Sequence, residues 1–189
     1  MSQTLSNLAK AFAGESQARN RYTFYSSIAK KEGYELIAHI FELTSNQEKE
    51  HASWLLKMIN EIKETNEPIA VETEVSTIRN STSNNLRSAI DGENYEHSSM
   101  YPEFSQIAIK EGYKEIGIRL MAIAKAEENH EQRFTVLLNR LEDGSIFSNP
   151  EPIVWVCREC GYMHIGTTPP KECPSCSHAQ SFFERKMEY

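Results

Sequence analysis

The sequence predicts an all-α four-helix bundle followed by a small β-rich domain built around four cysteines. Three observations carry this prediction. The first 143 residues contain two halves that repeat each other, apolar residues recur at helical spacing, and the cysteines form two Cys-x-x-Cys pairs near the C-terminus. We expect a bundle domain at 1–144, a linker at 145–152 and a second domain at 153–189.

The composition limits the function. A net charge of -7 with no run of Lys or Arg provides no electrostatic footprint for nucleic acid or anionic membranes. No stretch approaches the roughly 18 apolar residues of a membrane span, and the first residues lack the basic segment and apolar core of a signal peptide. We therefore expect a cytoplasmic protein with no nucleic-acid or membrane partner.

The first half of the chain recurs in the second half at an offset of 78 or 79 residues. Three motifs are repeated: Gly14-Glu15 as Gly92-Glu93, Lys31-Glu32-Gly33-Tyr34 as Lys110-Glu111-Gly112-Tyr113, and Glu48-x-x-His51 as Glu127-x-x-His130. Each copy is typical of a helical hairpin in which the glycine of the second motif caps the first helix in a left-handed conformation. Two hairpins make four helices.

Apolar residues at three- and four-residue spacing predict helices over about 5–31, 37–62, 86–110 and 116–141. The segment 64–81 between the hairpins is polar and carries Pro68, which indicates a long crossover along the bundle. Pro102 falls inside the third helix. Because proline lacks a backbone N–H, we expect a distortion within two turns of Glu96.

Acidic residues lie inside the apolar stripes of these helices and therefore point at the bundle axis. They are Glu15, Glu48, Glu93, Glu96 and Glu127. A buried carboxylate without a partner is strongly destabilising, so cations must accompany this set, and two divalent metals fit its charge. One Glu from each of two helices and a Glu-x-x-His pair from each of the other two is the ligand pattern of di-iron and di-manganese bundles. The two histidines of the pattern are His51 and His130.

A single Glu-x-x-His motif usually marks a solvated helix face, but two copies in register favour a metal site. Glu96 has no acidic counterpart in the first repeat, where Ala18 stands, so it indicates a spare or exchangeable ligand. Tyr22 and Tyr101 are placed either to donate hydrogen bonds to ligand carboxylates or simply to pack in the core. The remaining histidines, which include His97, have no partner at metal-ligand spacing and receive no role.

The second domain starts after a linker with two prolines, at a strand-like run over 153–156. Its cysteines are Cys157, Cys160, Cys173 and Cys176. In a reducing compartment two Cys-x-x-Cys pairs at this spacing predict a tetrahedral metal site rather than disulfides. Zinc and iron both accept four thiolates, so a structural zinc ribbon stays open, and the neighbouring redox site favours iron as a one-electron carrier.

With these motifs the whole chain resembles the rubrerythrin family. The resemblance rests on Glu15, Glu48, His51, Glu93, Glu96, Glu127 and His130, followed by a rubredoxin-like module with the four cysteines. It implies a ferritin-like bundle with a di-iron centre that reduces hydrogen peroxide to water in oxidative-stress defence. Electrons would come from a nicotinamide-dependent reductase, or from a rubredoxin, through the rubredoxin-type iron.

The resemblance also implies roles for single residues. Glu48 and Glu127 would bridge the irons, Glu15 and Glu93 would be terminal ligands, and His130 would bind the second iron. Glu96 and His51 would exchange on the first iron as its redox state changes. Members of the family are typically homodimers, some of them with helices swapped between subunits.

Two other functions compete with a peroxidase. A ferroxidase or iron-handling protein that uses dioxygen would need the same ligands, and the sequence does not report the relative rates with peroxide and oxygen. A zinc-ribbon interaction module on a structural bundle would leave the buried glutamates unexplained. The appended cysteine domain favours a reductase that is fed with electrons.

Overall fold

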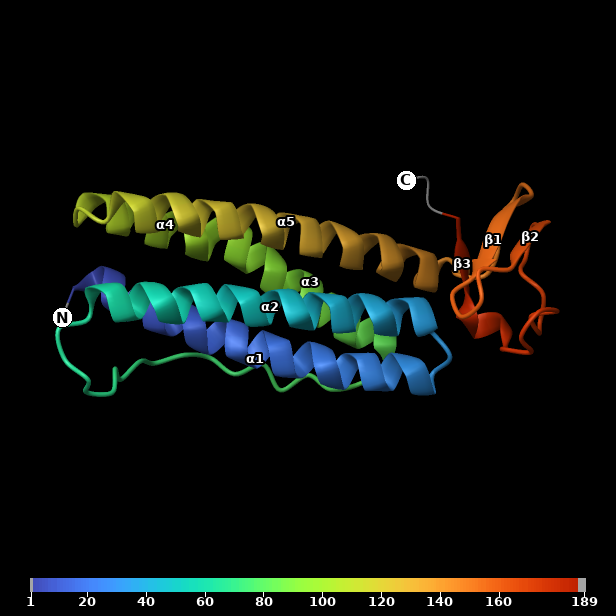
Figure 1. The fold of residues 1–189 in the computed structure, drawn as a ribbon, viewed down its shortest axis with the longest axis horizontal. Helices are drawn as coiled ribbons and strands as arrows, with labels where there is room; N and C mark the ends of the chain where they lie inside the picture. The colour runs from blue at the N-terminus through green and yellow to red at the C-terminus, as the bar shows by residue number, and fades with distance from the viewer. Residues whose placement is uncertain (1, 187–189) are drawn as a thin grey trace.

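The computed structural model describes residues 2–186, so the last three residues of the predicted second domain lie outside it. Long helices form a bundle, and a small sheet domain lies at one end (Figure 1). The helical elements are α1 (Gln3–Lys31), α2 (Glu35–Ile62), α3 (Thr82–Tyr95), η1 (Glu96–Met100), α4 (Tyr101–Lys110) and α5 (Lys114–Glu142). The predicted all-α bundle with a β-rich appendage is confirmed.

The two hairpins close with the same turn. Gly33 and Gly112 adopt positive φ angles of 82° and 91°, a conformation that a residue with a side chain rarely takes. After each glycine, the N–H of the following tyrosine donates back to a carbonyl of the preceding helix, Tyr34 to Ala29 at 2.9 Å and Tyr113 to Ala108 at 2.8 Å. The Lys-Glu-Gly-Tyr motif is therefore the helix stop in both repeats.

The third helix consists of α3, η1 and α4, and η1 is a π-helical turn that starts at Glu96. The N–H of Tyr101 donates to the carbonyl of Glu96, five residues back, and Pro102 follows directly. The predicted distortion beside Glu96 is confirmed. Its form was not predicted: it is a widened turn with one extra residue.

The predicted crossover is also confirmed. Residues 63–81 form no helix or strand and run beside the bundle along its length, as Figure 1 shows in green. The hydroxyl of Tyr25 on α1 donates to the carbonyl of Ile78 at 2.7 Å, which holds the crossover against the bundle. The second hairpin thus starts at the end of the bundle where the first hairpin turns.

The apolar core of the bundle is divided into two clusters. The proximal cluster, near the sheet domain, is rich in aromatic rings and contains Ala18, Tyr22, Tyr25, Phe41, Leu86 and Phe134. The distal cluster, near the N-terminus, contains Leu8, Ala11, Leu55, Met58, Tyr101 and Leu120. The acidic residues predicted to face the axis lie between the two clusters in sequence on every helix, so a polar layer separates the two apolar parts.

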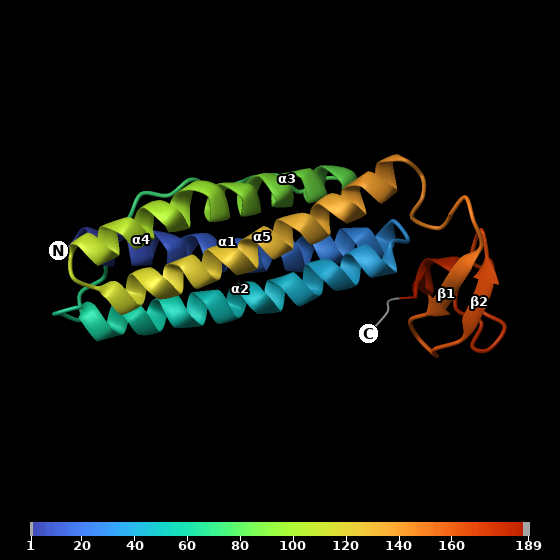
Figure 2. The same ribbon diagram turned by 90° about the horizontal axis from the view of Figure 1, so that it is seen from above.

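The C-terminal domain is a three-stranded antiparallel sheet in the order β2-β1-β3. Its strands are β1 (Ile153–Cys157), β2 (Met163–Gly166) and β3 (Phe183–Arg185), with a 3-10 turn, η2 (Gln180–Phe182), before β3. Trp155 and Phe183 are fully buried together with two of the cysteines. Figure 2 shows this domain beyond the end of α5 and beside the α1–α2 turn.

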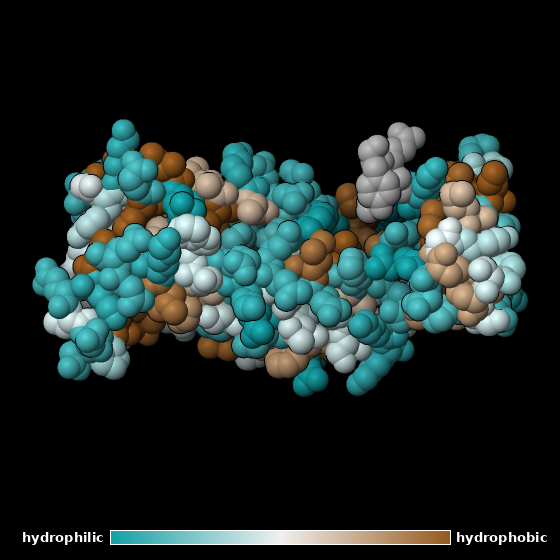
Figure 3. Space-filling model, viewed as in Figure 1, coloured by the Kyte–Doolittle hydropathy of each residue, from teal (hydrophilic) through white to brown (hydrophobic). Residues whose placement is uncertain are grey.

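The face shown in Figure 3 is mostly hydrophilic, with apolar residues in small separate groups. Within residues 2–186, no helix is long and apolar enough to cross a membrane.

Candidate metal centres

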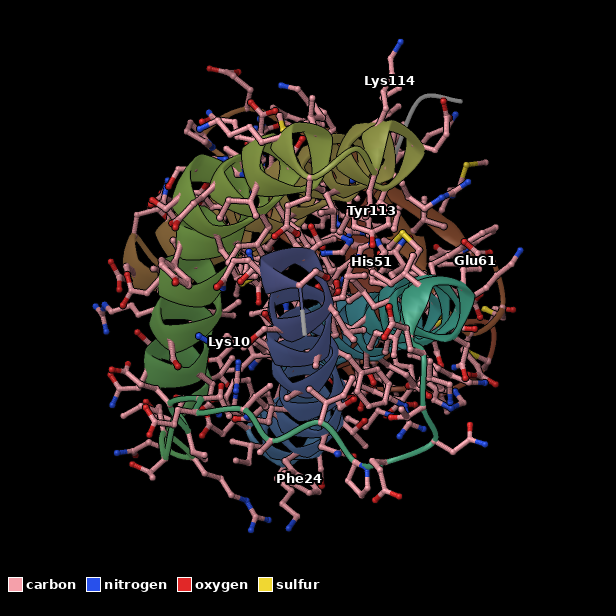
Figure 4. All side chains as sticks on the ribbon, turned by 90° about the vertical axis from the view of Figure 1, so that its left-hand side faces the viewer. Lys10, Phe24, His51, Glu61, Tyr113 and Lys114 are labelled. Carbon is pink, nitrogen blue, oxygen red and sulfur yellow. The ribbon has the colours of Figure 1, made fainter. Side chains whose placement is uncertain are left out.

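The polar layer of the bundle gathers carboxylates from all four helices. Glu15, Glu48, Glu93 and Glu127 are completely buried and His130 is 2% exposed. Figure 4, a view along the bundle, shows His51 pointing in between the helices, whereas Phe24, Glu61 and Lys114 point outward. Sequence periodicity placed these ligand candidates inside the bundle, and the structure puts them there.

The first group of possible ligands consists of Glu15, Glu48, His51 and Glu127, whose ligating atoms lie within 4.8 Å of one another. Nδ1 of His51 lies 2.8 Å from Glu127 Oε1, 3.0 Å from Glu48 Oε2 and 3.8 Å from Glu15 Oε2. One imidazole nitrogen therefore faces three different carboxylates.

The second group consists of Glu48, Glu93, Glu127 and His130, again within 4.8 Å. Nδ1 of His130 lies 2.8 Å from Glu127 Oε2, 3.0 Å from Glu48 Oε1 and 3.5 Å from Glu93 Oε2. Glu48 and Glu127 belong to both groups, and each turns one oxygen toward each histidine. The two groups are therefore neighbours that share two carboxylates.

The protein groups alone do not satisfy this layer. The ring nitrogen of a histidine can donate only one hydrogen bond, yet each Nδ1 faces three acceptors. Among the described residues, buried oxygens of Glu15, Glu48, Glu93 and Glu127 have no hydrogen-bond partner, nor does Nδ1 of His130. Carboxylate and imidazole groups that converge with too few hydrogens to pair them all fit two divalent transition metals.

Charge crowding shifts the pKa values of the metal-free layer. Burial, followed by the charges of its neighbours, raises the pKa of Glu15 well above its usual range and that of Glu93 to about 8. Burial also raises the pKa of Glu48, but the nearby imidazoles of His130 and His51 outweigh it and lower the pKa to about 2. Burial lowers the pKa of His130, but Glu127 and Glu48 outweigh it and raise the pKa to about 11. Metal-free histidines in this layer therefore hold a proton in place of a metal.

Two tyrosines donate to the outer carboxylates. The hydroxyl of Tyr22 donates to Glu93 Oε1 at 2.5 Å, and the hydroxyl of Tyr101 donates to Glu15 Oε1. Both rings are also part of the apolar clusters, Tyr22 proximal and Tyr101 distal. Each tyrosine thus holds one oxygen of its carboxylate. The other oxygen of Glu15 is directed at His51, and the other oxygen of Glu93 is directed at His130.

Glu96 is not brought into either group. Its carboxylate lies toward α1, where Oε1 is 4.0 Å from the place that a Cβ on Gly14 would occupy. Burial, followed by Glu15, raises its pKa well above the usual range. Glu96 is therefore a fifth carboxylate that lies beside the groups and outside them.

The structure reveals a contact that the sequence did not predict. Nε2 of His97 lies 2.6 Å from Glu131 Oε2, and the amide of Asn94 donates to Glu131 Oε1 at 3.2 Å. Glu131 thus ties α5 to both sides of the start of the π turn. The spacing of His97 and Glu131 in the sequence gives no sign of this pair, because the contact depends on how α3 and α5 are rotated against each other.

The four cysteine sulfurs form the third group, within 4.8 Å of one another. The Sγ atoms of Cys157 and Cys176, and those of Cys160 and Cys173, are 3.7 Å apart, and all four cysteines are free. A tetrahedral metal with bonds of about 2.3 Å to sulfur requires sulfur–sulfur edges of about 3.8 Å. The backbone N–H of Tyr162, followed by Cys176, lowers the pKa of Cys160 to about 6, so its thiolate is stabilised. The spacing fits a four-thiolate metal.

The bundle and the cysteine domain both match known families. Residues 6–138 match the rubrerythrin family model, and residues 155–184 match the model of the rubrerythrin, rubredoxin-like domain. The chain belongs to the rubrerythrin family. As in other rubrerythrins, a ferritin-like bundle precedes a rubredoxin-like domain, and the carboxylate and histidine groups together with the four cysteines fit a di-iron site and a rubredoxin-type iron.

Similar rubrerythrins cover all or nearly all of this chain. A putative rubrerythrin of Methanocaldococcus jannaschii is 51% identical over 100% of this chain and 95% of its own. A rubrerythrin of Porphyromonas gingivalis is 47% identical over 97% of this chain and 90% of its own. The solved structure of fully reduced, all-ferrous nigerythrin is 30% identical, with a TM-score of 0.66 over 98% of this chain and 88% of that chain.

Proposed function

We propose that this rubrerythrin reduces hydrogen peroxide to water with electrons that enter through its rubredoxin-like iron. The observation that carries the proposal is the pairing of two sites in one chain. A buried two-group carboxylate layer suits a two-electron reaction, and a four-thiolate site suits one-electron feeding. Membership of a family of oxidoreductases supports it.

The groups suggest a role for each residue. Glu48 and Glu127 belong to both groups and would bridge two irons, Glu15 and Glu93 would each hold one, and His51 and His130 would complete the two sites. Iron held by these residues would supply the redox chemistry for reduction of the oxygen–oxygen bond. Tyr22 and Tyr101 orient the terminal carboxylates through their hydrogen bonds. We propose Glu96 as the exchangeable ligand, because it lies beside the two ligand groups but belongs to neither of them.

Apolar side chains on both sides of the polar layer favour a redox reaction that is shielded from water. The proximal and distal clusters close the layer along the bundle axis with apolar side chains, which keeps water away from the carboxylates. Each peroxide takes up two electrons and two protons and yields two waters, so a donor must renew the electrons. We propose a nicotinamide-dependent reductase or a rubredoxin as that donor, in the reducing cytoplasm, and a homodimer, with or without swapped helices, as the working form.

A rapid-mixing experiment tests the proposal. The iron-loaded protein is reduced completely without oxygen and mixed with one equivalent of peroxide or with dissolved oxygen, while the visible bands of both centres are followed. Faster oxidation by peroxide that includes the four-thiolate band supports the peroxidase. Faster oxidation by oxygen, or a four-cysteine site with no visible band, would instead indicate a ferroxidase with a zinc-filled appendage.

Two variants sharpen the test. His51→Ala should slow peroxide turnover roughly 10–100-fold and leave the visible spectrum of the four-thiolate iron intact, because it removes one ligand of the first group. Cys160→Ala should abolish steady-state turnover with a reductase and preserve a single turnover after chemical reduction. Unchanged turnover in His51→Ala would remove this histidine from the mechanism.

A further inference from the structure

The segment that joins the two domains is bound tightly to the second one. Arg185, the last residue of β3, reaches across to this segment with both terminal nitrogens of its guanidinium. Nη1 donates to Asn149 Oδ1 at 2.7 Å, and Nη2 donates to the carbonyls of Ser148 at 2.8 Å and Ser145 at 3.0 Å. One side chain therefore holds both ends of residues 145–149.

Other contacts fix the same segment to the sheet domain. The N–H of Asn149 donates to the carbonyl of Thr167, just after β2, at 2.8 Å. Within the linker itself, the Asn149 side chain donates to the carbonyl of Glu151 at 2.8 Å. The guanidinium carbon of Arg185 lies 5.6 Å from the centre of the Trp155 ring, which is completely buried. Arg185 thus connects the joining segment to the core of the cysteine domain.

The opposite face of this segment packs on the bundle. Ile146 packs against the proximal cluster. The ring of Phe147 stacks on Tyr34, in the α1–α2 turn, with centroids 6.4 Å apart and planes 10° apart. Residues 145–149 therefore contact the bundle with their apolar side chains, and they contact the cysteine domain with two backbone carbonyls and with Asn149.

We propose that Arg185 is a positioning residue that turns residues 145–149 from a tether into a rigid splint between the two domains. A guanidinium is planar and offers five donors in a fixed fork, so it can bind three acceptors of a bent segment at once. The splint holds the four-cysteine site in one orientation relative to the bundle. For electron delivery this matters because transfer depends steeply on the distance and orientation of the two centres. That consequence rests on the proposed function, whereas the splint itself does not.

Hydrogen exchange of the iron-loaded protein tests the splint directly. In Arg185→Gln the amides of residues 145–149 should exchange roughly tenfold faster or more, since at least one charge-assisted hydrogen bond to the segment is lost. In Arg185→Lys the exchange rate of these amides should lie between those of the parent protein and Arg185→Gln, because an ammonium keeps the charge but cannot reproduce the forked donors of a guanidinium. The visible band of the four-thiolate iron should be unchanged in both variants. Arg140→Gln is the matched control, because it removes a guanidinium near the end of α5 that makes no side-chain hydrogen bond within residues 2–186.

A second variant acts on the bundle face. Phe147→Ala removes the stack on Tyr34 and leaves the contacts of Arg185 in place. It should broaden the distribution of domain separations seen by small-angle X-ray scattering, as Arg185→Gln should, while Arg140→Gln should not. Electron transfer from the reduced four-thiolate iron to the oxidised di-iron site should be slower in both Arg185→Gln and Phe147→Ala, because each variant loosens residues 145–149.

Each result has a definite meaning. Unchanged exchange and scattering in both Arg185→Gln and Phe147→Ala would overturn the splint, whatever the activity. If Arg185→Gln loses the visible band, its iron domain has unfolded, and Asn149→Ala, which removes one acceptor of Arg185, then decides through the exchange of the 145–149 amides. Faster exchange without any change in electron transfer would keep the splint and count against the proposed electron route.

Discussion

Gly14 lies beside the carboxylate of Glu96. It is part of α1, one residue before Glu15, and the nearest atom to its missing Cβ is Glu96 Oε1 at 4.0 Å. Its counterpart in the second repeat, Gly92, has nothing within 4 Å of its own Cβ position. The two glycines are equivalent in sequence, but only Gly14 has a carboxylate beside it.

We predict that Gly14→Val moves Glu96 toward the metal groups. The methyl groups of valine extend about 1.5 Å beyond Cβ and take the space of the carboxylate. An additional anionic ligand favours ferric iron, so the midpoint potential of the di-iron site should shift to more negative values, and peroxide turnover should fall roughly 10–100-fold. Potentiometric titration and steady-state assays measure the two effects. Gly92→Val makes the same change of helix propensity, and an equal shift in that variant would contradict the prediction.

The titrating residues of the layer predict how the metal-free protein responds to pH. The pKa of His130 is raised from 6.5 to about 11 and that of Glu93 from 4.5 to about 8. In both cases the folded state binds a proton more tightly than the unfolded state. The stability they contribute is therefore lost as pH rises, for His130 above pH 6.5 and for Glu93 above pH 4.5.

Urea unfolding of the iron-free protein should show this loss. Between pH 6.5 and 8 the free energy of unfolding should fall by about 3 kcal/mol, roughly half of it from each of the two groups. Iron displaces these protons, so the iron-loaded protein should not lose stability over the same range, and its affinity for iron should rise with pH. A metal-free protein that becomes more stable toward pH 8 would show that the layer does not hold these protons.

At the scale of a helix, the π turn decides which side chains meet at the layer. A π turn adds one residue to a helix and rotates everything after it by about 100° relative to everything before it. Glu93 and Glu96 lie before or at this turn, and Tyr101 lies after it. The turn therefore lets Tyr101 reach Glu15 while Glu93 faces His130.

Deletion of Ser99 should disrupt the metal-binding layer while the helix formed by α3, η1 and α4 stays helical. Ser99 is exposed within η1, and its removal restores an ordinary α-helical register. Either the two glutamates or Tyr101 must then turn away, so iron binding should fall below two irons per bundle while helix content by circular dichroism stays close to that of the parent protein. Ser99→Ala keeps the length and should bind iron normally. Full iron binding after the deletion would mean that the π turn has no part in building the site.

The sequence contains a sign of the π turn that the proline alone does not give. The repeat offset is 78 residues at Gly14 and Gly92 but 79 at Lys31 and Lys110, so the second repeat has one residue more between these points. The extra residue falls where η1 lies. Pro102 indicated a distortion, and the change of offset specifies that it is an insertion.

At the scale of the whole molecule, the periodic spacing of apolar and acidic residues predicted the features that depend on which face of a helix a residue occupies. The four helices, the crossover and the burial of the glutamates follow from spacing, because a helix places residues three and four apart on one side. The position of Glu96 outside both groups does not follow, because spacing places a residue on a helix face but does not set the direction of its carboxylate, which here lies beside Gly14. The splint does not follow either, because Arg185 binds mostly backbone carbonyls, which every sequence provides.

We predict that the bundle tolerates a break in the crossover. The residues on both sides of the Glu72–Thr73 bond are exposed and outside any helix. Fragments 1–72 and 73–189, produced together, should assemble and bind about two irons in their bundle, as iron analysis of the purified pair would show. Either fragment alone should not bind the pair of irons, because each group takes ligands from both hairpins. Stable two-iron binding by fragment 1–72 alone would contradict this division of ligands.

The shared carboxylates of the two groups also bear on ancestry. Each group combines three ligands of one hairpin, among them its Glu-x-x-His pair, with a single carboxylate of the other hairpin, so half of the present bundle holds no complete set of ligands. An ancestor half as long would have needed a second copy of itself to hold the same metals. In that case gene duplication preserved a pre-existing symmetric assembly, and covalent fusion then allowed one copy to gain Glu96 and the inserted residue of the π turn without imposing them on the other.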